Sequence, residues 1–459
     1  MKEDKRKKIY NSITDIRDEY IEEAASEGKR RRLHRGLWSA AAAAVLVAAV
    51  TAVAIFWPGR GAQGPQETVL AKSYEPDYRK TYDGAELDGK YLADIRTFAA
   101  KAGRSILDSS ATTAYSPTTL YTALSMVSEL ADGSSLKALL EALGAEDTGE
   151  LRANSGNLWR YLCTNPDMRQ PGKVTLANSM WLNKNYTFNE ESLQNLADHY
   201  YVASYTGDMR HVIPQKVSEW VRRQTNGLLD CQIKPGDATM AVLLSAIYFY
   251  DEWEEPFKES LTISGWFSTA DEERVDCNYM RRTQEHWAYY QGEGVTASVQ
   301  YFKNGGKMLF ILPDDGKSPA DVLNNPALTA SLLDWEGLDK EEAKVEWAIP
   351  RFTLSDTIDL EEGLIALGLG ELFDSGANPL PGLSDEASAY IGHAEQGTAI
   401  SIDEKGCEAA SYVEIWMTEG GALETEKLVK IHLSSPFVFA ILSDNDVPLF
   451  LGVVNNPNG

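Results

Sequence analysis

Cysteine is scarce in this chain, and so are the patterns that build metal or redox sites. The 459 residues include four cysteines, Cys163, Cys231, Cys277 and Cys407, which lie far apart and form no CxxC pair. Cysteines at that spacing predict neither a zinc site nor a redox motif, and four are too few to make a disulfide scaffold of so long a chain. A nucleophilic role for Cys407 is disfavoured as well, because the neighbouring Glu408 raises rather than lowers a thiol pKa.

Recognisable catalytic motifs are also absent. The sequence has no GxSxG elbow, no HExxH, no Walker A loop and no GxGxxG after a strand. The stretch DDGKSPAD contains Gly-Lys-Ser but lacks the earlier glycine of a phosphate-binding loop, so it reads as a turn. Of the six histidines, His393 and His432 flank an unusual C-terminal segment, where structural or exposed roles are favoured over catalysis. We therefore expect no enzyme, no cofactor and no metal.

Positive charge is in short supply. There are 43 Lys and Arg against 68 Asp and Glu, a net charge of −25. Phosphate binding needs clustered basic residues, so this balance argues against nucleic acid as a partner. The apolar fraction of 43% and the charged fraction of 24% are those of a chain with a packed core.

One long uncharged run stands near the N-terminus. Residues 37–57, LWSAAAAAVLVAAVTAVAIFW, number 21 and would cross a hydrocarbon layer of about 30 Å as a helix. Trp38 and Trp57 lie at its ends, where interfacial aromatics belong, and the basic stretch Lys29–Arg35 precedes it. We interpret it as an uncleaved transmembrane helix; a cleaved signal peptide, whose apolar region would start nearer Met1, and a buried core helix are the alternatives.

This anchor divides the chain. Residues 1–36 become a basic cytoplasmic tail, residues 58–87 a polar Gly- and Pro-containing stalk, and residues 88–459 a single extracellular domain on a single-pass cell-membrane protein. The part after residue 57 carries 32 basic and 60 acidic residues, a net charge of −28. Such an acidic domain is soluble and can steer cationic partners, solubility being the simpler reason for the charge.

Within residues 88–459 the patterns predict an α+β domain. Helical periodicity is strongest early, over 91–107, 118–131 and 135–144. Strand-like runs follow at 173–183, 240–250, 306–313, 344–354, 398–403 and 437–443. Because strands mostly follow one another rather than alternating with helices, a mixed sheet is favoured over a doubly wound parallel one.

The stretch DEKGCEAASYVEIWMTEGG, residues 403–421, combines features of a strand and a loop. With period two, one face carries Cys407, Ala409, Ser411 and then apolar residues, whereas the other carries Glu408 and further polar or amphipathic residues. Gly406 precedes this alternation and Gly420-Gly421 follow it. The segment is therefore either an ordinary permanent strand or one that can be a loop at one time and a strand at another.

The same stretch resembles the hinge of a serpin reactive-centre loop, and other segments resemble serpin signatures in the same order. These are YSPTTLYTALSM (115–126), ANSMWLN (177–183), VSEWVRRQTNGLL (217–229), LSAIYFYDEWEEPF (244–257), IPRFTL (349–354), LIALGLGELFD (364–374) and the closing PFVFAILSDNDVPLFLGVVNNP (436–457). Each motif is modest alone, but together they cover residues 90–457. The chain is thus identified as resembling a membrane-anchored, bacterial-type member of the serpin family.

The resemblance implies a serpin fold with a large mixed β-sheet and an exposed loop that inhibits serine, and possibly cysteine, proteases. Cleavage of the loop would form an acyl-enzyme, and the hinge would then insert as a new strand of the large sheet. The hinge maps onto Glu404, Lys405, Gly406, Cys407, Glu408, Ala409, Ala410 and Ser411. Small inward-facing residues would let it slide into the sheet.

Counting from the hinge places the scissile bond between Gly420 and Gly421. The span from Glu404 to Pro436 is longer than in familiar members, and counting back from Pro436 gives the alternative Glu424–Thr425, with Leu423 nearby. A small residue before the bond would suit elastase-like or subtilisin-like proteases. A monomer is expected, and the competing function is a non-inhibitory serpin-fold binding module at the cell surface.

The resemblance also places a polar shutter beneath the sheet, at Ser116, Thr119, Asn178 and Ser245. Several positions depart from the usual family residue. Ser245 stands where Asn is usual, Thr119 where Ser is usual and Gln396 where His is usual, while Cys407 replaces Thr or Ser. These shutter departures bear on how firmly the sheet is held closed by buried hydrogen bonds, more than on the fold.

Overall fold

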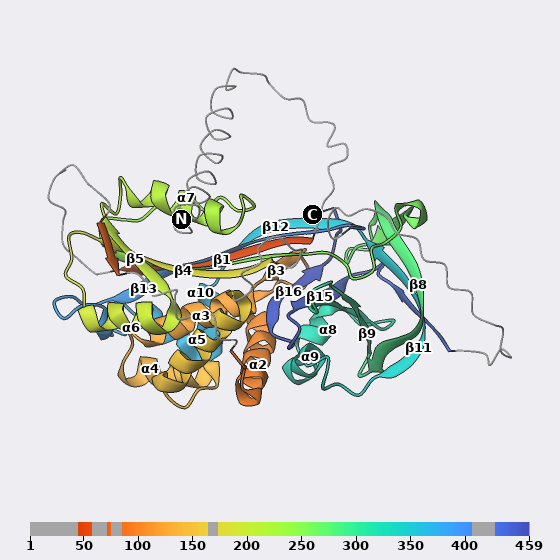
Figure 1. Ribbon diagram of the computed structural model, residues 1–459, viewed down its shortest axis with the longest axis horizontal. Coiled ribbons are helices and arrows are strands. Elements are labelled where there is room, and N and C mark those ends of the chain that lie inside the picture. The colour runs from red at the N-terminus through yellow and green to blue at the C-terminus, as the bar shows by residue number, and fades with distance from the viewer. Residues whose placement is uncertain (1–44, 57–70, 75–84, 164–172, 406–426, 459) are drawn as a thin grey trace, which may run out of the picture. The chain divides into compact units, whose positions relative to one another are not determined.

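Two β-sheets and a set of helices make up the chain (Figure 1). The computed structural model describes residues 45–56, 71–74, 85–163, 173–405 and 427–458. All of these residues belong to one compact unit, Ala42–Gly459. The α+β class expected from the sequence is confirmed.

The first sheet has seven strands in the order β12-β13-β1-β6-β4-β5-β2. Neighbours are antiparallel except for the parallel pair β4 and β5. The strands are β1 (Val45–Phe56), β2 (Ala71–Tyr74), β4 (Lys173–Asn183), β5 (Val202–Gly207), β6 (Thr239–Asp251), β12 (Phe352–Asp359) and β13 (Tyr390–Ile402). We refer to it as the seven-stranded sheet.

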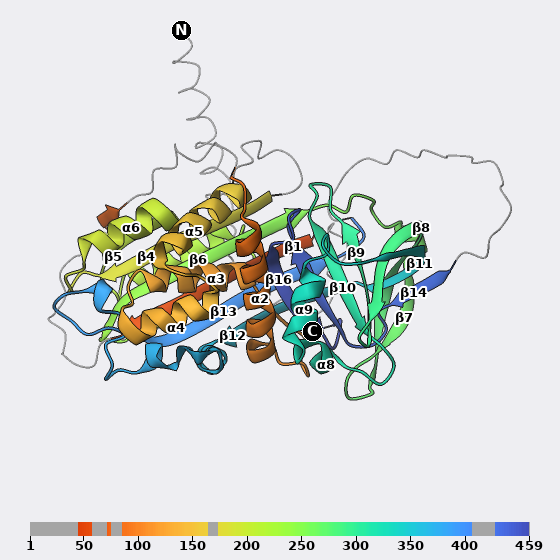
Figure 2. The same cartoon turned by 90° about the horizontal axis from the view of Figure 1, so that it is seen from below.

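The second sheet has nine strands, eight of them in the order β14-β11-β8-β9-β10-β15-β16-β3, with β7 paired to β8. Figure 2 shows β14 at its outer edge. The strands are β3 (Thr113–Tyr115), β7 (Ile263–Ser268), β8 (Arg274–Gly292), β9 (Val295–Tyr301), β10 (Lys307–Pro313), β11 (Glu341–Pro350), β14 (Leu428–His432), β15 (Phe437–Leu442) and β16 (Pro448–Val454).

Helices cover both faces of the seven-stranded sheet, with α7 on one face and α3 to α6 on the other (Figure 1). The helices are α2 (Gly89–Ile106), α3 (Pro117–Ser128), α4 (Gly133–Leu143), α5 (Thr148–Cys163), α6 (Glu190–Tyr200), α7 (Ile213–Gln224), α8 (Pro319–Leu323), α9 (Pro326–Leu333) and α10 (Glu361–Leu364). Short helical turns are η2 (Glu259–Leu261), η3 (Ile365–Leu369), η4 (Gly370–Phe373) and η5 (Pro381–Leu383).

Strand β6 is apolar on both faces because helices cover both. Its Val242 and Leu244 pack in one cluster with α7, whereas Leu243 and Ile247 pack in the main core with the helices of the opposite face. A strand buried on both sides reads as a continuous apolar run rather than an alternation, which is the pattern of residues 240–250.

Helix α3 is buried all round, which places its N-terminus beneath the sheet. Pro117 occupies the first turn, and the Ser116 hydroxyl caps the helix by accepting from the Thr119 backbone N–H at 3.2 Å. Every residue of α3 is buried. Some of its hydroxyl groups bond within the helix, as when Ser125 donates to the Tyr121 carbonyl at 2.8 Å. The Thr118 hydroxyl donates instead to the Pro448 carbonyl of β16 at 3.0 Å.

Within residues 88–459 the predicted helices and strands are present, with one division that the sequence did not suggest. The helical patterns correspond to α2, α3 and α4, and the strand runs correspond to strands of the two sheets. The single run expected at 344–354 is split at Arg351 into β11 and β12, which belong to different sheets.

The structure departs from the sequence prediction at the N-terminal apolar run. Residues Val45–Phe56 form strand β1, where the sequence predicts part of a membrane-spanning helix. Among the described residues, no helix is long and apolar enough to cross a membrane. The physical reason is that a run of Val, Ala, Leu and Ile suits a doubly buried strand as well as an apolar helix, and periodicity cannot separate the two.

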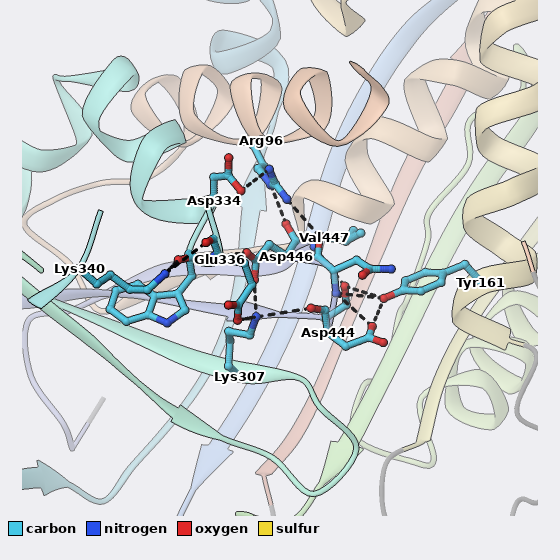
Figure 3. A network of polar contacts seen from close by, with 12 residues as sticks. Arg96, Tyr161, Lys307, Asp334, Glu336, Lys340, Asp444, Asp446 and Val447 are labelled. Carbon is cyan, nitrogen blue, oxygen red and sulfur yellow. Dashed lines mark hydrogen bonds and ion pairs between the residues drawn. The ribbon is translucent and has the colours of Figure 1, made fainter. Parts of the chain in front are cut away.

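A buried ion pair links β10 of the nine-stranded sheet to helix α2 through the turn before β16 (Figure 3). The Lys307 ammonium lies 2.6 Å from the Asp446 carboxylate, and both side chains are 1% exposed. The second Asp446 oxygen accepts from the Glu336 backbone N–H at 2.8 Å, and the Asp446 carbonyl accepts from Arg96 at 3.1 Å. Burial raises the pKa of Asp446 despite the opposing effect of the Lys307 hydrogen bond.

Replacing Lys307 by Met should destabilise the chain in a pH-dependent way. The change leaves the Asp446 carboxylate buried without its cation, and we expect a loss of about 3–5 kcal/mol in unfolding free energy at pH 7. A group whose pKa is raised in the folded chain supports folding at low pH and loses that contribution as the pH rises through the folded pKa. The loss should therefore be larger at pH 8 than at pH 5, as measured by urea unfolding.

The matched control is Lys340→Met, because the ammonium of this less buried lysine contacts the Trp335 carbonyl rather than a buried carboxylate. We expect it to change the unfolding free energy by less than about 1 kcal/mol at either pH. An equal loss for Lys307→Met at pH 5 and pH 8 would contradict the role given to Asp446.

Candidate functional site

The predicted hinge begins directly after β13, at one end of the seven-stranded sheet. Asp403, Glu404 and Lys405 are described, and the Lys405 backbone N–H donates to the Asp403 carboxylate at 3.0 Å. The other predicted loop residues lie outside the described residues: Gly406, Cys407, Glu408, Ala409, Ala410, Ser411, Gly420, Gly421, Leu423, Glu424 and Thr425.

Glu404, at the start of the predicted hinge, is buried to 2% exposure although it is a charged residue. Its carboxylate accepts hydrogen bonds from Arg351, one of them at 2.8 Å, and from the Thr262 hydroxyl. Burial alone would raise the pKa of Glu404, but the hydrogen bonds from Arg351 and Thr262 outweigh it, so the pKa of the carboxyl is lowered. Glu404 is therefore held ionised and paired.

Trp253 fixes the backbone immediately before the hinge, and the sequence reasoning did not single it out. Its indole N–H donates to the Asp403 carbonyl at 2.8 Å, and its ring stacks on Phe302 with centroids 4.7 Å apart. The Phe257 backbone N–H adds a bond to the Glu404 carbonyl at 2.9 Å. The available signal was the motif LSAIYFYDEWEEPF, which contains Trp253 and Phe257.

Next to β13 lies the central strand position of the seven-stranded sheet, and β1 fills it. Strand β1 is antiparallel to β13 on one side, with Leu46 opposite Ser401, and antiparallel to β6 on the other, with Val45 opposite Asp251. Strands β6 and β13 consequently run in the same direction on either side of it. We call this place the central position; its beginning, at Val45, lies at the end of β13 from which the hinge leaves.

Three of the predicted shutter features meet beneath the central position. The Gln396 amide oxygen accepts from the Ser116 backbone N–H at 2.7 Å, and its amide nitrogen donates to the Ser116 carbonyl at 3.2 Å. The same nitrogen donates to the Thr119 hydroxyl at 2.8 Å. Gln396 therefore joins β13 to the N-terminus of α3.

Asn178 and Ser245 lie in the same region but do not join this group. They are opposite each other in the pairing of β4 with β6. The Asn178 amide donates to the Tyr200 carbonyl at 2.8 Å. Its carbonyl oxygen and the Ser245 hydroxyl have no hydrogen-bond partner within the described part of the chain. Ser116 and Thr119 of the predicted shutter are thus hydrogen-bonded to Gln396, whereas Asn178 and Ser245 are not part of that network.

Past the loop, the chain is tied to the other sheet. Strand β14 begins at Leu428 and pairs in parallel with β11 at the sheet edge, with Val345 opposite Val429. The preceding Lys427 ammonium contacts the Glu341 carboxylate at 2.8 Å, which lowers the pKa of Glu341. His432 lies 2.9 Å from Glu346. The ends of the predicted loop are therefore held by different sheets.

The cysteines and histidines of the described residues form no nucleophilic arrangement. Cys163, Cys231 and Cys277 are free, and burial raises the pKa of the Cys163 and Cys231 thiols to about 12. His393 is 46% exposed on its side chain and contacts Glu395 at 3.1 Å. These surroundings agree with the structural or exposed roles predicted for the histidines.

The comparisons with known proteins agree with this arrangement. A family model described as serpin (serine protease inhibitor) matches residues 93–457. Serpin-ZX of Arabidopsis thaliana is 26% identical over 360 residues, which cover 75% of this chain and 91% of that protein. Neuroserpin of Mus musculus is 26% identical over 367 residues, covering 75% of this chain and 85% of that protein.

Solved structures resemble the chain over most of its length. The crystal structure of the thermophilic serpin tengpin in its native state has a TM-score of 0.69 at 25% identity, covering 82% of this chain and 96% of that one. A structure of thyroxine-binding globulin in complex with thyroxine has a TM-score of 0.64 at 22% identity, covering 83% of this chain and all of that one. The second likeness concerns the fold alone.

Removal of the Gln396 bridge should weaken the link between β13 and α3. Gln396→Leu leaves the Ser116 backbone N–H buried without the amide oxygen that accepts from it, although the Ser116 carbonyl keeps the Leu120 N–H. We expect a loss of about 1–3 kcal/mol in unfolding free energy. The control is Gln396→His, which carries the usual family residue and can still bond at this place. Thermal and urea unfolding of both variants measure the effect, and an equal loss for Leu and His would contradict it.

Proposed function

The chain belongs to the serpin family, and on that premise we propose that it is an inhibitor of serine-type endopeptidases that acts by a suicide mechanism. The family is one of serine protease inhibitors rather than of enzymes. The observation that carries the proposal is the position of the hinge. It leaves β13 at the end where the central position of the seven-stranded sheet begins, so that a chain turning back would run antiparallel to β13 and β6.

The proposed reaction begins as ordinary proteolysis. The protease serine oxygen attacks the carbonyl carbon before the scissile bond, the peptide C–N bond breaks, and the leaving nitrogen takes up a proton. The product is an ester between the protease and the cleaved loop. Insertion of the hinge-side segment into the sheet then carries the ester-linked protease away before water can hydrolyse the ester.

The anchored residues support a defined starting point for that insertion. Glu404 is held by Arg351 and Thr262, and the preceding carbonyl is held by Trp253. The chain beyond Lys405 can therefore turn into the central position while the residues before it stay fixed. The small inward positions Cys407, Ala409 and Ser411 fit a strand that must pass over the buried shutter.

Target preference follows from the loop sequence. Cleavage between Gly420 and Gly421 favours elastase-like or subtilisin-like serine proteases, whose substrate pockets take small side chains, and cysteine proteases of similar preference are a further class. Cleavage at Glu424–Thr425 remains the alternative. We propose that the inhibitor acts as a monomer; the bacterial-type assignment remains a prediction.

A second candidate function is a non-inhibitory binding module with a serpin fold. One observation favours it: β1 occupies the central position, and a permanently filled position would leave no place for the loop. Such a chain would be cleaved as a substrate without trapping the protease. The two functions therefore differ in whether cleavage leads to a covalent complex.

We also propose that residues 37–57 anchor the protein in a cell membrane, with residues 1–36 in the cytoplasm and the serpin domain outside. The support is the uncharged length of the run, its flanking tryptophans and the basic stretch before it. Residues Val45–Phe56 of this run are also β1, so the anchor and the strand are alternative states of one segment.

Inhibition and the inward face of the hinge can be tested together. We expect the chain beginning at Pro58, once its cooperative unfolding is verified, to form a denaturation-resistant complex with an elastase-like or subtilisin-like protease. Mass spectrometry should find a released fragment that starts near Gly421. Ala409→Arg places a charge on the inward face, and we expect at least a tenfold loss of complex with cleavage retained, because burying an unpaired charge opposes insertion.

The matched control is Glu408→Arg, which places the same residue on the outward face one position away. It should form the complex at nearly the level of the unsubstituted chain, as read from gels and inhibition stoichiometry. Cleavage of the unsubstituted chain without any complex would favour the binding-module function instead.

Anchoring can be tested in bacterial cells that express the full chain. We expect the chain to resist alkaline extraction from membranes and its C-terminal domain to be open to protease added outside. Val47→Lys with Val50→Lys should release it, because each lysine near the bilayer centre costs about 2.5–3.5 kcal/mol. Gln63→Lys with Gln66→Lys, in the stalk, should leave it bound; release of both variants, or of neither, would contradict the anchor.

A further inference from the structure

The chain fills its own central strand position with a segment from its N-terminus. Strand β1 contributes 12 residues, and it is paired along its length with both β6 and β13. Figure 1 shows β1, in red, as an inner strand of the seven-stranded sheet rather than an added edge. We call residues 45–56 the plug.

The plug and the predicted insert would occupy the same place in the same direction. A segment that turns back after β13 first meets Ser401 and then runs toward Tyr390. The plug does the same, since Leu46 lies opposite Ser401 and Phe56 opposite Tyr390. The alternating loop segment 407–418 also has 12 residues, so the lengths match as well.

The one polar residue of the plug favours the strand register that the structure shows. Thr51 is the only polar residue among the 12. In the pairing it lies opposite Ser245 of β6 and Gln396 of β13, the two strand residues at the shutter that are polar and fully buried. A shift by one residue would put an apolar residue in this row and reverse the faces of the whole strand, so the sequence selects this register.

Two strands cannot share the central position. The edge of β6 and the edge of β13 that face this position each offer one row of backbone donors and acceptors. While the plug is in place, the hinge finds no free backbone donors and acceptors of β6 and β13 at this position. If the proposed function holds, on which this step rests, a protease that cleaves the loop of the plugged chain would complete hydrolysis and leave.

A lipid bilayer is the second environment that suits the plug. Inside a membrane a segment must satisfy its backbone internally, as a helix does, and must carry few polar groups. The plug lies within the uncharged run 37–57, which has the length to span a bilayer. The sheet and the bilayer therefore compete for one segment, and only one of them can hold it.

We propose that residues 45–56 plug the central strand position of the free chain and keep it in a non-inhibitory state, and that transfer of this segment into a lipid bilayer opens the position for the loop. The protein would then be inhibitory at a membrane and inactive away from one. A chain released from its membrane or never inserted would be cleaved without trapping a protease.

Paired cysteines can report where the plug is. Ala48 lies directly opposite Ala399, so Ala48→Cys with Ala399→Cys should form a disulfide when the plug is in the sheet. Ala399 in turn lies opposite Ser355 of β12. Ala48→Cys with Ser355→Cys is the matched control, because its two cysteines are separated by an intervening strand and cannot bridge. All chains carry Cys407→Ser.

The full chain is made by cell-free synthesis, either without lipid or with preformed vesicles of phosphatidylcholine and phosphatidylglycerol, and then oxidised. We expect the Ala48→Cys/Ala399→Cys disulfide in most of the lipid-free chain, at least fivefold less with vesicles, and no control disulfide in either sample. Leu46→Cys with Ser401→Cys is a second in-register pair in case the first does not fold. Absence of both in-register disulfides without lipid, or equal yields with vesicles, overturns the proposal.

The same samples are then mixed with a subtilisin-like protease. We expect vesicle-bound chain to form the covalent complex and oxidised lipid-free chain to be cleaved without one. Complex formation by the oxidised lipid-free chain would overturn the plug. If disulfide yields follow the lipid but no sample ever forms a complex, the plug stands and the inhibitory function fails. If the in-register disulfides never form but the chain beginning at Pro58 traps proteases, the inhibitory function stands and the plug fails.

Discussion

The structure depends on one requirement: two strands that run in the same direction, β6 and β13, each present an edge that must be hydrogen-bonded. In this chain β1 meets both edges at once, as a strand antiparallel to each. Because the sheet lies between α7 and the opposite helices, an unpaired edge could not be left to water. Whatever segment takes this place is therefore hydrogen-bonded along both of its edges, as β1 is.

Two sets of hydrogen bonds connect β13, on one side of the central position, to its surroundings. Gln396 ties β13 to the cap of α3, while Glu404 ties the end of β13 to Arg351, at the junction of β11 and β12. Gln396 and Glu404 are buried and hydrogen-bonded, whereas Arg351 is partly exposed, so each connection fixes the geometry of β13 through a buried polar side chain. Under the proposed function, insertion of the segment after Lys405 leaves the flanking strands in place.

Much of the fold followed from local patterns. The helix after Ser116 could be recognised from its helical periodicity, and β6 could be recognised from its apolar run, because β6 is buried on both faces. The division at Arg351 could not, because nothing local shows that a strand run changes sheets. Trp253 was missed for a similar reason: an indole N–H gains its role only when a carbonyl distant in sequence is brought to 2.8 Å from it.

By itself the sequence determined the family, and it marked residues 37–57 as an uncharged run without deciding whether that run is a helix or a strand. The hinge and shutter positions that it indicates stay predictions. The tertiary structure alone decided that Val45–Phe56 pairs as a strand between β6 and β13. The reason is physical. A run of Val, Ala and Leu can satisfy its backbone as a helix in lipid or as a strand in a sheet, and only the presence of two open, parallel-running edges in the folded domain makes the strand possible.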